Sequence, residues 1–198
     1  MKVITISWEY GAGGHSIGRK VAENLGIEIY DKDIIEETAL AMGLSPDKVK
    51  ADEEMITKGD SFIRAITPIS FDYKDTIYNY EKEYILKVAS QGPCVILRRC
   101  AGAILEEENI ESLNVFLYAD EVYREKRIGE ILQIDDAALV ARQVKKTDNF
   151  RDAYYNHYTG KHMGDVKNWH LSLDTGTLGY DKCAELICQA AKQSTDNE

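Results

Sequence analysis

Apolar residues follow two different rhythms along this chain. In some segments they form short, β-branched runs, which are typical of buried parallel strands. In others an apolar residue returns every three or four positions, which is typical of a helix with one buried face. We predict strands over residues 3–7, 27–30, 94–97, 114–118 and 171–173, and helices over residues 17–25, 33–42, from 45 onward, 72–90, 101–107, 121–132, 135–155 and 180–192. Because strands alternate with helices, the pattern predicts an α/β fold with a mostly parallel sheet.

The composition narrows the class of protein. A length of 198 residues suits one domain with a real hydrophobic core. No stretch approaches about 18 uncharged apolar residues, and the first residues lack the features of a secretory signal, so we expect no membrane span. The net charge of −10 argues against non-specific nucleic-acid binding as the main task, but it leaves room for a basic pocket that binds a small anion.

The cysteines carry little functional signal. Cys94, Cys100, Cys183 and Cys188 form no C-x-x-C pair. With no secretion signal expected, they favour reduced thiols and a cytoplasmic protein. Cys94, Cys183 and Cys188 stand in apolar surroundings, so we expect small core residues rather than a metal cluster.

The most informative local pattern is a strand, a glycine-rich turn and a helix within residues 3–25. In such a turn backbone N–H groups converge on an anion, and the helix N-terminus adds a positive end. The candidate phosphate cradle consists of Gly11, Ala12, Gly13, Gly14, His15 and Ser16. The turn does not match a Walker loop, G-x-x-x-x-G-K-[ST], and only approaches the dinucleotide-binding pattern G-x-G-x-x-G, for which Asp31 would suit the ribose-binding acid. Taken alone, the turn leaves open a phosphate loop, a dinucleotide loop or a tight turn without a ligand.

Six blocks of the chain resemble, in order, those of the cytidylate-kinase-like proteins. Residues 6–19, ISWEYGAGGHSIGR, resemble the family's opening, I-S-R-E-Y-G-S-G-G-R-E-I-G-R. The later blocks are residues 25–35 (LGIEIYDKDII), 95–101 (VILRRCA), 115–119 (VFLYA) followed by two arginines, 145–155 and 171–179. Each block alone is weak, but their order and spacing extend the resemblance over nearly the whole chain.

The resemblance implies a P-loop kinase-like three-layer fold, in which helices flank a five-stranded parallel sheet. It implies a single domain over residues 1–198, with a helical acceptor-binding insert at about 44–92 and a lid at about 120–155. It also implies transfer of a phosphoryl group from ATP, with Mg²⁺, to a nucleoside monophosphate. CMP or dCMP is the first candidate for that acceptor.

Phosphoryl transfer depends mainly on positioning and on neutralising charge, and the resemblance assigns these tasks to matched residues. Ser16 falls where a Walker loop carries its Mg²⁺ ligand. Arg99 is the best candidate for gripping the acceptor phosphate, because arginine binds phosphate through two parallel hydrogen bonds. Asp148 and Arg151 match the element that faces CMP in cytidylate kinases. Asp31, at a strand end, is expected either to help hold Mg²⁺ or a substrate hydroxyl, or to cap the following helix.

The resemblance also implies a lid of positively charged side chains that closes over the transferred phosphoryl group. Its candidates are Arg124, Arg127 and Lys145, on the two predicted helices that flank residue 133. Without the resemblance, the spacing of the two arginines indicates only a solvated helix face.

The chain departs from the family pattern where the chemistry is concentrated. Trp8 and His15 replace two arginines, and Arg98 and Cys100 replace two glycines. Lys20 lies too far into its helix to act as a Walker lysine. Three hypotheses therefore stay open: a nucleoside monophosphate kinase, a non-catalytic nucleotide-binding module on the same fold and, least favoured, a dinucleotide-dependent oxidoreductase.

Overall fold

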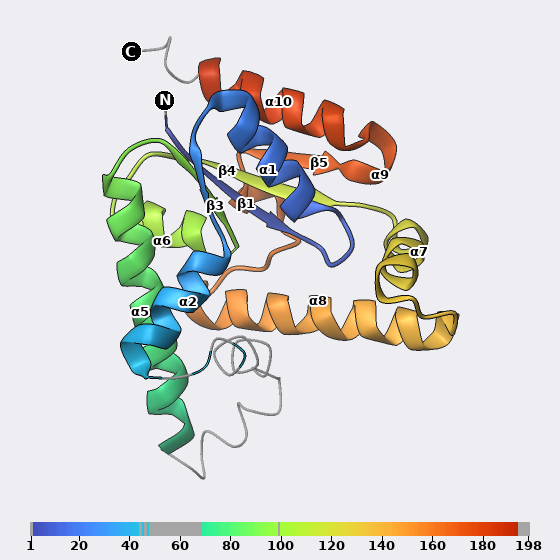
Figure 1. Ribbon diagram of the computed structural model, residues 1–198, viewed down its shortest axis with the longest axis horizontal. Helices are drawn as coiled ribbons and strands as arrows, with labels where there is room; N and C mark the ends of the chain where they lie inside the picture. Colours follow the sequence, from blue (N-terminus) through green and yellow to red (C-terminus); the bar gives the residue numbers. More distant parts are fainter. Residues whose placement is uncertain (1, 44, 46, 48–68, 99, 194–198) are drawn as a thin grey trace.

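The computed structural model describes residues 2–43, 45, 47, 69–98 and 100–193, and it shows a parallel sheet between two layers of helices (Figure 1). The strands are β1 (Val3–Trp8), β2 (Glu28–Tyr30), β3 (Cys94–Leu97), β4 (Ser112–Tyr118) and β5 (Leu171–Asp174). They lie in the order β2-β3-β1-β4-β5, and every neighbouring pair is parallel. The predicted α/β fold with a five-stranded parallel sheet is confirmed.

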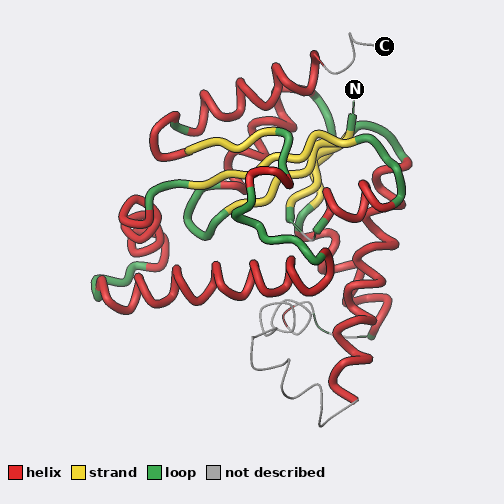
Figure 2. The backbone as a smooth tube through the Cα atoms, turned by 180° about the vertical axis from the view of Figure 1, so that it is seen from behind, coloured by secondary structure: helices red, strands yellow, loops and turns green. Residues whose placement is uncertain are grey.

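Helices cover both faces of this sheet. The main described helices are α1 (Gly14–Leu25), α2 (Lys32–Met42), α5 (Ile69–Ser90), α6 (Ala101–Glu107), α7 (Glu121–Leu132), α8 (Ala137–Thr159), α9 (Thr175–Leu178) and α10 (Tyr180–Gln193). Helices α1 and α10 lie together on one face, and α5, α6 and α8 lie on the other (Figures 1 and 2). The helix predicted to start at residue 45, like much of the predicted insert, lies largely outside the described residues. None of the described helices is both long and apolar enough to cross a membrane.

The alternation of side chains along each strand divides the core into two parts. Ile4 and Ile6 of β1 belong to the part that packs against α1 and α10. Ile96 of β3 and Phe116 of β4 belong to the part that packs against α5 and α6 and reaches Tyr155 on α8. Because both faces of the sheet are covered, the strands are continuous apolar runs rather than alternating ones.

Helix α5 buries one residue that its sequence pattern did not predict. The apolar residues Ile77, Ile85 and Val88 of this helix are buried, and so is Glu81, which is 0% exposed. A hydrogen bond from the hydroxyl of Tyr154, 2.9 Å away, satisfies part of this carboxyl group. A buried acid with such a partner is tolerated in a core, but its charge hides it from a search for apolar periodicity.

The parallel arrangement brings the carboxyl ends of the strands to one edge of the sheet, where α/β proteins commonly bind ligands. The loops that follow β1, β3 and β4 meet at this edge. Helix α8 runs past it, and Nη1 of Arg151 on α8 donates to the backbone carbonyl of Trp8 at 3.2 Å. The candidate site is therefore assembled at this edge from segments that are distant in sequence.

Candidate functional site

The loop between β1 and α1 has the backbone shape of an anion cradle. The amide of Glu9 still donates to the carbonyl of Leu117, so β1 pairs with β4 up to the start of the loop. The amide of Ala12 then donates back to the carbonyl of Glu9 at 3.0 Å, which closes a tight turn. Gly11 and Gly13 have φ angles of 92° and 86°, in the left-handed region that favours glycine. The first N–H groups of α1, which have no acceptor inside the helix, follow directly.

Close packing requires two of these glycines independently of any ligand. A Cβ atom at Gly13 would lie 2.4 Å from Cζ of Tyr180, and one at Gly14 would lie 2.0 Å from Cδ2 of Trp8. Real side chains do not approach each other so closely. The aromatic rings therefore press against the loop from α10 and from the end of β1, and hold its backbone in place.

A pocket of about 310 Å³ opens above this loop, and its charged lining is cationic. Arg98 comes from the end of β3, Arg127 from α7, Arg151 from α8 and His15 from the first turn of α1. Among the described residues, no aspartate or glutamate lines this pocket. We call it the carboxyl-edge pocket. Three elements thus direct guanidinium groups at one glycine loop, on a protein whose net charge is −10.

Neutral partners orient two of the guanidinium groups. Nη1 of Arg127 donates to the carbonyl of Gly11 at 3.3 Å, and its Cζ lies 5.2 Å from the centre of the Tyr180 ring. Nη1 of Arg151 donates to the carbonyl of Trp8, and its Cζ lies 5.8 Å from the centre of that ring. Backbone carbonyls and aromatic faces do not cancel a guanidinium charge, and no acid is among the described residues that line the pocket, so its lining favours anions.

Trp8, His15, Asp31 and Arg98 form a connected group on one side of the pocket. Trp8 is 3% exposed; the guanidinium of Arg98 lies 4.9 Å from its ring centre, and the His15 ring meets it edge-on at 5.0 Å. The carboxylate of Asp31 accepts from Nη2 of Arg98 at 3.1 Å and lies 2.9 Å from Nδ1 of His15. Burial alone would raise the pKa of Asp31, but the His15 hydrogen bond and the charge of Arg98 outweigh it and hold that pKa well below its usual range. Asp31 precedes α2 without a side-chain cap bond, so its carboxylate positions two residues of the pocket.

Arg124 lies behind the loop rather than in the pocket. It is 7% exposed, and it donates to the carbonyls of Ala119 and Tyr10, both at 3.0 Å. It also pairs with the carboxylates of Glu9, at 3.1 Å, and Asp148. Asp148 in turn accepts from the amide of Tyr10 at 2.7 Å. Two residues predicted for the lid and the acceptor site, Arg124 and Asp148, therefore tie α7 and α8 to the glycine loop.

A second pocket of about 310 Å³ adjoins the first, and the two share Trp8 and Arg151. Its lining includes three acids, Glu9, Asp148 and Asp152. Burial raises the pKa of Glu9, and the charge of Arg124 opposes this shift. We call this cavity the acidic pocket. Carboxylates accept hydrogen bonds, so it suits hydroxyl or amino groups, whereas its neighbour suits phosphates.

The structure does not bring every predicted residue into these pockets. Lys145 is exposed on α8 and lines neither of them. Ser16 lies half-exposed in the first turn of α1, and Arg99 lies outside the described residues. Lys20, which lies too far into α1 to act as a Walker lysine, pairs with Asp181 of α10 at 2.7 Å.

Arg98 was not among the predicted site residues, although an arginine in place of a family glycine could restore a charge near the cradle. Arg98 and Cys100, the positions at which the resemblance has glycine, adopt left-handed φ angles of 65° and 57°. Such a conformation costs a non-glycine residue about 1 kcal/mol. The backbone thus keeps the shape that glycine permits, and at position 98 the strained residue contributes a guanidinium to the pocket.

The residues present fit Mg²⁺ only as an ion that arrives with a nucleotide. In the described part of the chain, no group of three or more His, Cys, Asp or Glu side chains is arranged to hold a metal ion. The carboxylate of Asp31 is engaged by Arg98 and His15. Ser16 offers one hydroxyl at the edge of the cradle. This matches the usual binding of Mg²⁺ through substrate phosphates, water and one or two protein ligands.

Comparison with known proteins agrees with this architecture. No curated protein sequence matches the chain. An uncharacterized protein from Eubacterium ventriosum has a similar structure, with a TM-score of 0.70 and 23% identity over 96% of this chain and 98% of that one. Two kinases share the fold, which is that of P-loop kinases. One is a shikimate kinase from Bacteroides thetaiotaomicron, with a TM-score of 0.53 and 13% identity over 98% of both chains. The other is a gluconokinase from Sinorhizobium meliloti, with a TM-score of 0.54 and 14% identity over 100% of this chain and 97% of that one. Residues 3–177 match the cytidylate kinase-like family, as the resemblance predicted, and the chain belongs to that family.

Proposed function

We propose that this protein transfers a phosphoryl group from ATP to a small acceptor, with CMP or dCMP as the first candidate. The observation that carries the proposal is the carboxyl-edge pocket. Arg98, Arg127 and Arg151 converge there over a glycine loop, and no acid lines the pocket among the described residues. Catalysis of phosphoryl transfer consists largely of such positioning and charge stabilisation.

The nucleotide phosphates would lie on the loop, with the backbone N–H groups of Gly13 to Ser16 as donors. Arg127 and Arg98, which both line the pocket, would contact phosphate oxygens. The Ser16 hydroxyl would hold Mg²⁺ together with those oxygens. When bound, Mg²⁺ supplies neutralisation of the charge on the phosphates. Asp31 would act as a positioning residue, because it fixes both Arg98 and His15.

The acceptor would occupy the acidic pocket, next to the phosphates. Arg151 lines both pockets, so it stands where the transferred group would pass from donor to acceptor. Asp148 and Asp152 offer acceptor oxygens toward a hydroxyl or an exocyclic amino group. By the family resemblance, Arg99 would bind the acceptor phosphate. Lys145 is exposed, so a role for it requires closure of the 120–155 lid.

A second function, nucleotide binding without catalysis, is favoured by one specific observation. Trp8 is buried where the family pattern has an arginine, and no lysine is among the described residues that line the carboxyl-edge pocket. Binding requires the loop and the cations, whereas turnover also requires a group that follows the transferred phosphoryl. Such a module would bind ATP and leave it intact.

A nucleotide panel separates these functions. The kinase predicts Mg²⁺-dependent ADP formation that rises when CMP or dCMP is added, together with thermal stabilisation by ATP. Arg151→Met should lower kcat/KM by about ten- to hundred-fold through the loss of charge-assisted hydrogen bonds. Arg142→Met is the matched control on the same helix, because Arg142 is exposed and its Nε donates to the carbonyl of Ala138.

Each other outcome identifies a different function. Stabilisation by ATP, with no ADP formed when any common monophosphate is added, would support the nucleotide-binding module without catalysis. Stabilisation by NAD but not by ATP would favour the oxidoreductase. Arg99→Ala should remove the response to the acceptor and keep the response to ATP, and an unchanged acceptor response would exclude Arg99 from that role.

A further inference from the structure

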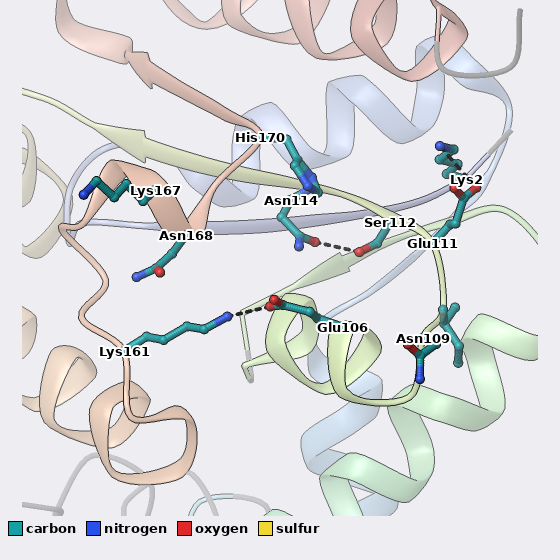
Figure 3. A pocket seen from close by; sticks show the side chains of 11 residues that line it. Lys2, Glu106, Asn109, Glu111, Ser112, Asn114, Lys161, Lys167, Asn168 and His170 are labelled. Atoms are coloured by element: carbon teal, nitrogen blue, oxygen red, sulfur yellow. Dashed lines mark hydrogen bonds and ion pairs between the residues drawn. The ribbon is translucent and has the colours of Figure 1, made fainter. Parts of the chain in front are cut away.

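A larger pocket lies at the opposite edge of the sheet, where the strands begin (Figure 3). Its volume is about 430 Å³, and we call it the amino-edge pocket. Lys2 precedes β1, Asn114 belongs to the start of β4 and His170 precedes β5, while Glu106 and Lys161 come from α6 and from the segment after α8. None of these residues belongs to the carboxyl-edge pocket.

The centre of this pocket is a buried amide with one unused donor. Asn114 is 7% exposed, and its Oδ1 accepts from the hydroxyls of Thr5 and Ser112, both at 2.8 Å. In this orientation of the amide both hydroxyls donate to Oδ1, so Nδ2 is the atom that faces the pocket. Its Nδ2 has no hydrogen-bond partner among the described residues, and it points toward the side of the pocket where Lys161 and Glu106 lie (Figure 3).

The surrounding structure holds this amide in place. A Cβ atom at Gly102 of α6 would lie 2.8 Å from Cγ of Asn114, so α6 packs directly behind the carboxamide. Asparagine is depleted in strands, yet here its Oδ1 holds two hydroxyl groups while its Nδ2 faces the pocket. An acceptor atom placed in the pocket would give Nδ2 a hydrogen-bond partner.

His170 adds a second donor beside the amide. Its Nδ1 accepts from the backbone N–H of Asn114 at 3.0 Å. In the neutral ring the hydrogen must then be on Nε2, so the imidazole is an N–H donor on the wall of the pocket. The labelled ring lies next to Asn114 in Figure 3.

Lysine side chains supply positive charge around these donors. Nζ of Lys161 extends to Glu106 at 2.6 Å, and Nζ of Lys2 pairs with Glu111 at 3.1 Å. Lys167 lies on the rim, and its ammonium points away from Asn114 (Figure 3). Three lysines against two glutamates leave one positive charge here, on a protein with a net charge of −10.

We propose that the amino-edge pocket binds a small hydroxylated acid. Its carboxylate or phosphate oxygens would accept from Nδ2 of Asn114, Nε2 of His170 and Nζ of Lys161. Its hydroxyl would donate to the carboxylate of Glu106, which stands beside Lys161. The ligand thus matches the donors and the acceptor of the pocket, and the site is distinct from the one assigned to phosphoryl transfer.

The test is a ¹⁵N NMR titration of the full chain with malate and, separately, with inorganic phosphate, against sodium chloride at equal ionic strength. The proposal predicts saturable shifts of the Asn114 side-chain NH₂ and the His170 imidazole. Shifts with malate alone assign a hydroxy acid, and shifts with phosphate as well assign a phosphorylated ligand. Amides of Gly11 and Gly13 report on the carboxyl-edge pocket in the same spectra.

Two independent variants test the site, so that a result is obtained even if one of them folds poorly. Asn114→Asp, which replaces the donor with an acceptor, and Lys161→Met should each weaken binding about tenfold or more. The control Lys182→Met removes an exposed lysine of α10 that pairs with Glu185, and it should bind like the wild type. If the Asn114 and His170 signals stay unchanged with both probes, or if both site variants bind as tightly as the wild type, the proposal is wrong.

Discussion

The two edges of one parallel sheet use positive charge in opposite ways. At the carboxyl edge, Arg127 and Arg151 donate to backbone carbonyls and lie against aromatic rings, and no acid is among the described residues that line their pocket. At the amino edge, Lys2 and Lys161 each pair with a glutamate. The first arrangement attracts any polyanion, whereas the second has little net charge and must select a ligand through hydrogen bonds. The presence or absence of acids in the described lining, rather than the number of cations, separates a site for phosphate chains from one for a small acid.

Helix polarity and backbone shape reinforce this difference. The carboxyl edge has the glycine loop and the first turn of α1, whose N–H groups add positive potential. The donors of the amino edge are side chains on strand β4, just before β5 and on the segment after α8. A variant that disrupts the carboxyl edge should therefore leave the amino-edge pocket intact.

The largest effect is expected from removing the cation behind the glycine loop. Arg124→Met leaves the partly exposed carboxylates of Glu9 and Asp148 without their buried guanidinium partner, and breaking a buried ion pair costs up to about 3–5 kcal/mol. Urea denaturation should show that loss in the free energy of unfolding. Arg142→Met, on the exposed face of α8, should change it by less than about 0.5 kcal/mol. Equal effects of the two substitutions would contradict the role given to Arg124.

A methyl group in the loop should be the next most damaging change. Gly13→Ala adds a left-handed strain of about 1 kcal/mol, and its clash with Tyr180 adds about 1–3 kcal/mol of overpacking. Gly26→Ala is matched to it, because Gly26 has a φ of 64° and open space around it, so it should cost only the strain. Thermal unfolding of both variants measures the difference, and equal losses would show that Tyr180 does not confine the loop.

Arg98 allows strain and charge to be separated. Arg98→Gly and Arg98→Ala both remove the guanidinium, but only glycine relieves the left-handed conformation. The glycine variant should therefore be more stable than the alanine variant by about 1 kcal/mol, while both bind ATP more weakly than the wild type. Wild-type ATP affinity in either variant would exclude Arg98 from the nucleotide site.

The smallest effect is a dependence of stability on pH. The pKa of Asp31 is lower in the folded chain than its ordinary value of about 3.9, so its contribution is complete above that value and is lost as the pH falls below it. The wild type should exceed Asp31→Asn in unfolding free energy at pH 6, and the gap should narrow between about pH 4 and pH 3. A difference in unfolding free energy that stays constant over this range would show that Asp31 does not hold Arg98 and His15.

The fold could be predicted largely from the sequence because its strands are buried on both faces. The continuous run of β1 and the four-residue repeat of α1 each reflect one physical constraint, and the structure reproduces both. The buried stripe of α5 was predicted less well, because Glu81 is polar and its burial depends on Tyr154, which is distant in sequence.

The candidate site could be predicted only in part, because side-chain direction depends on tertiary partners. Arg124 and Arg127 are one helical turn apart, yet the first is enclosed by Tyr10, Ala119 and Asp148 while the second reaches the pocket. Arg98 was not among the predicted site residues, since the sequence does not show whether its side chain points into the site. The amino-edge pocket was not predicted either, because its residues meet only when the strands are side by side.

The central claim is that the carboxyl-edge pocket binds the phosphates of a nucleotide. Isothermal titration calorimetry of Mg²⁺–ATP binding to the double variant Arg127→Met and Arg151→Met tests it most directly, with Lys161→Met as the control at the amino edge. We predict an affinity at least about a hundredfold weaker for the double variant, from two lost charge-assisted contacts, and an unchanged affinity for the control. Binding of ATP by the double variant with wild-type affinity would contradict the claim.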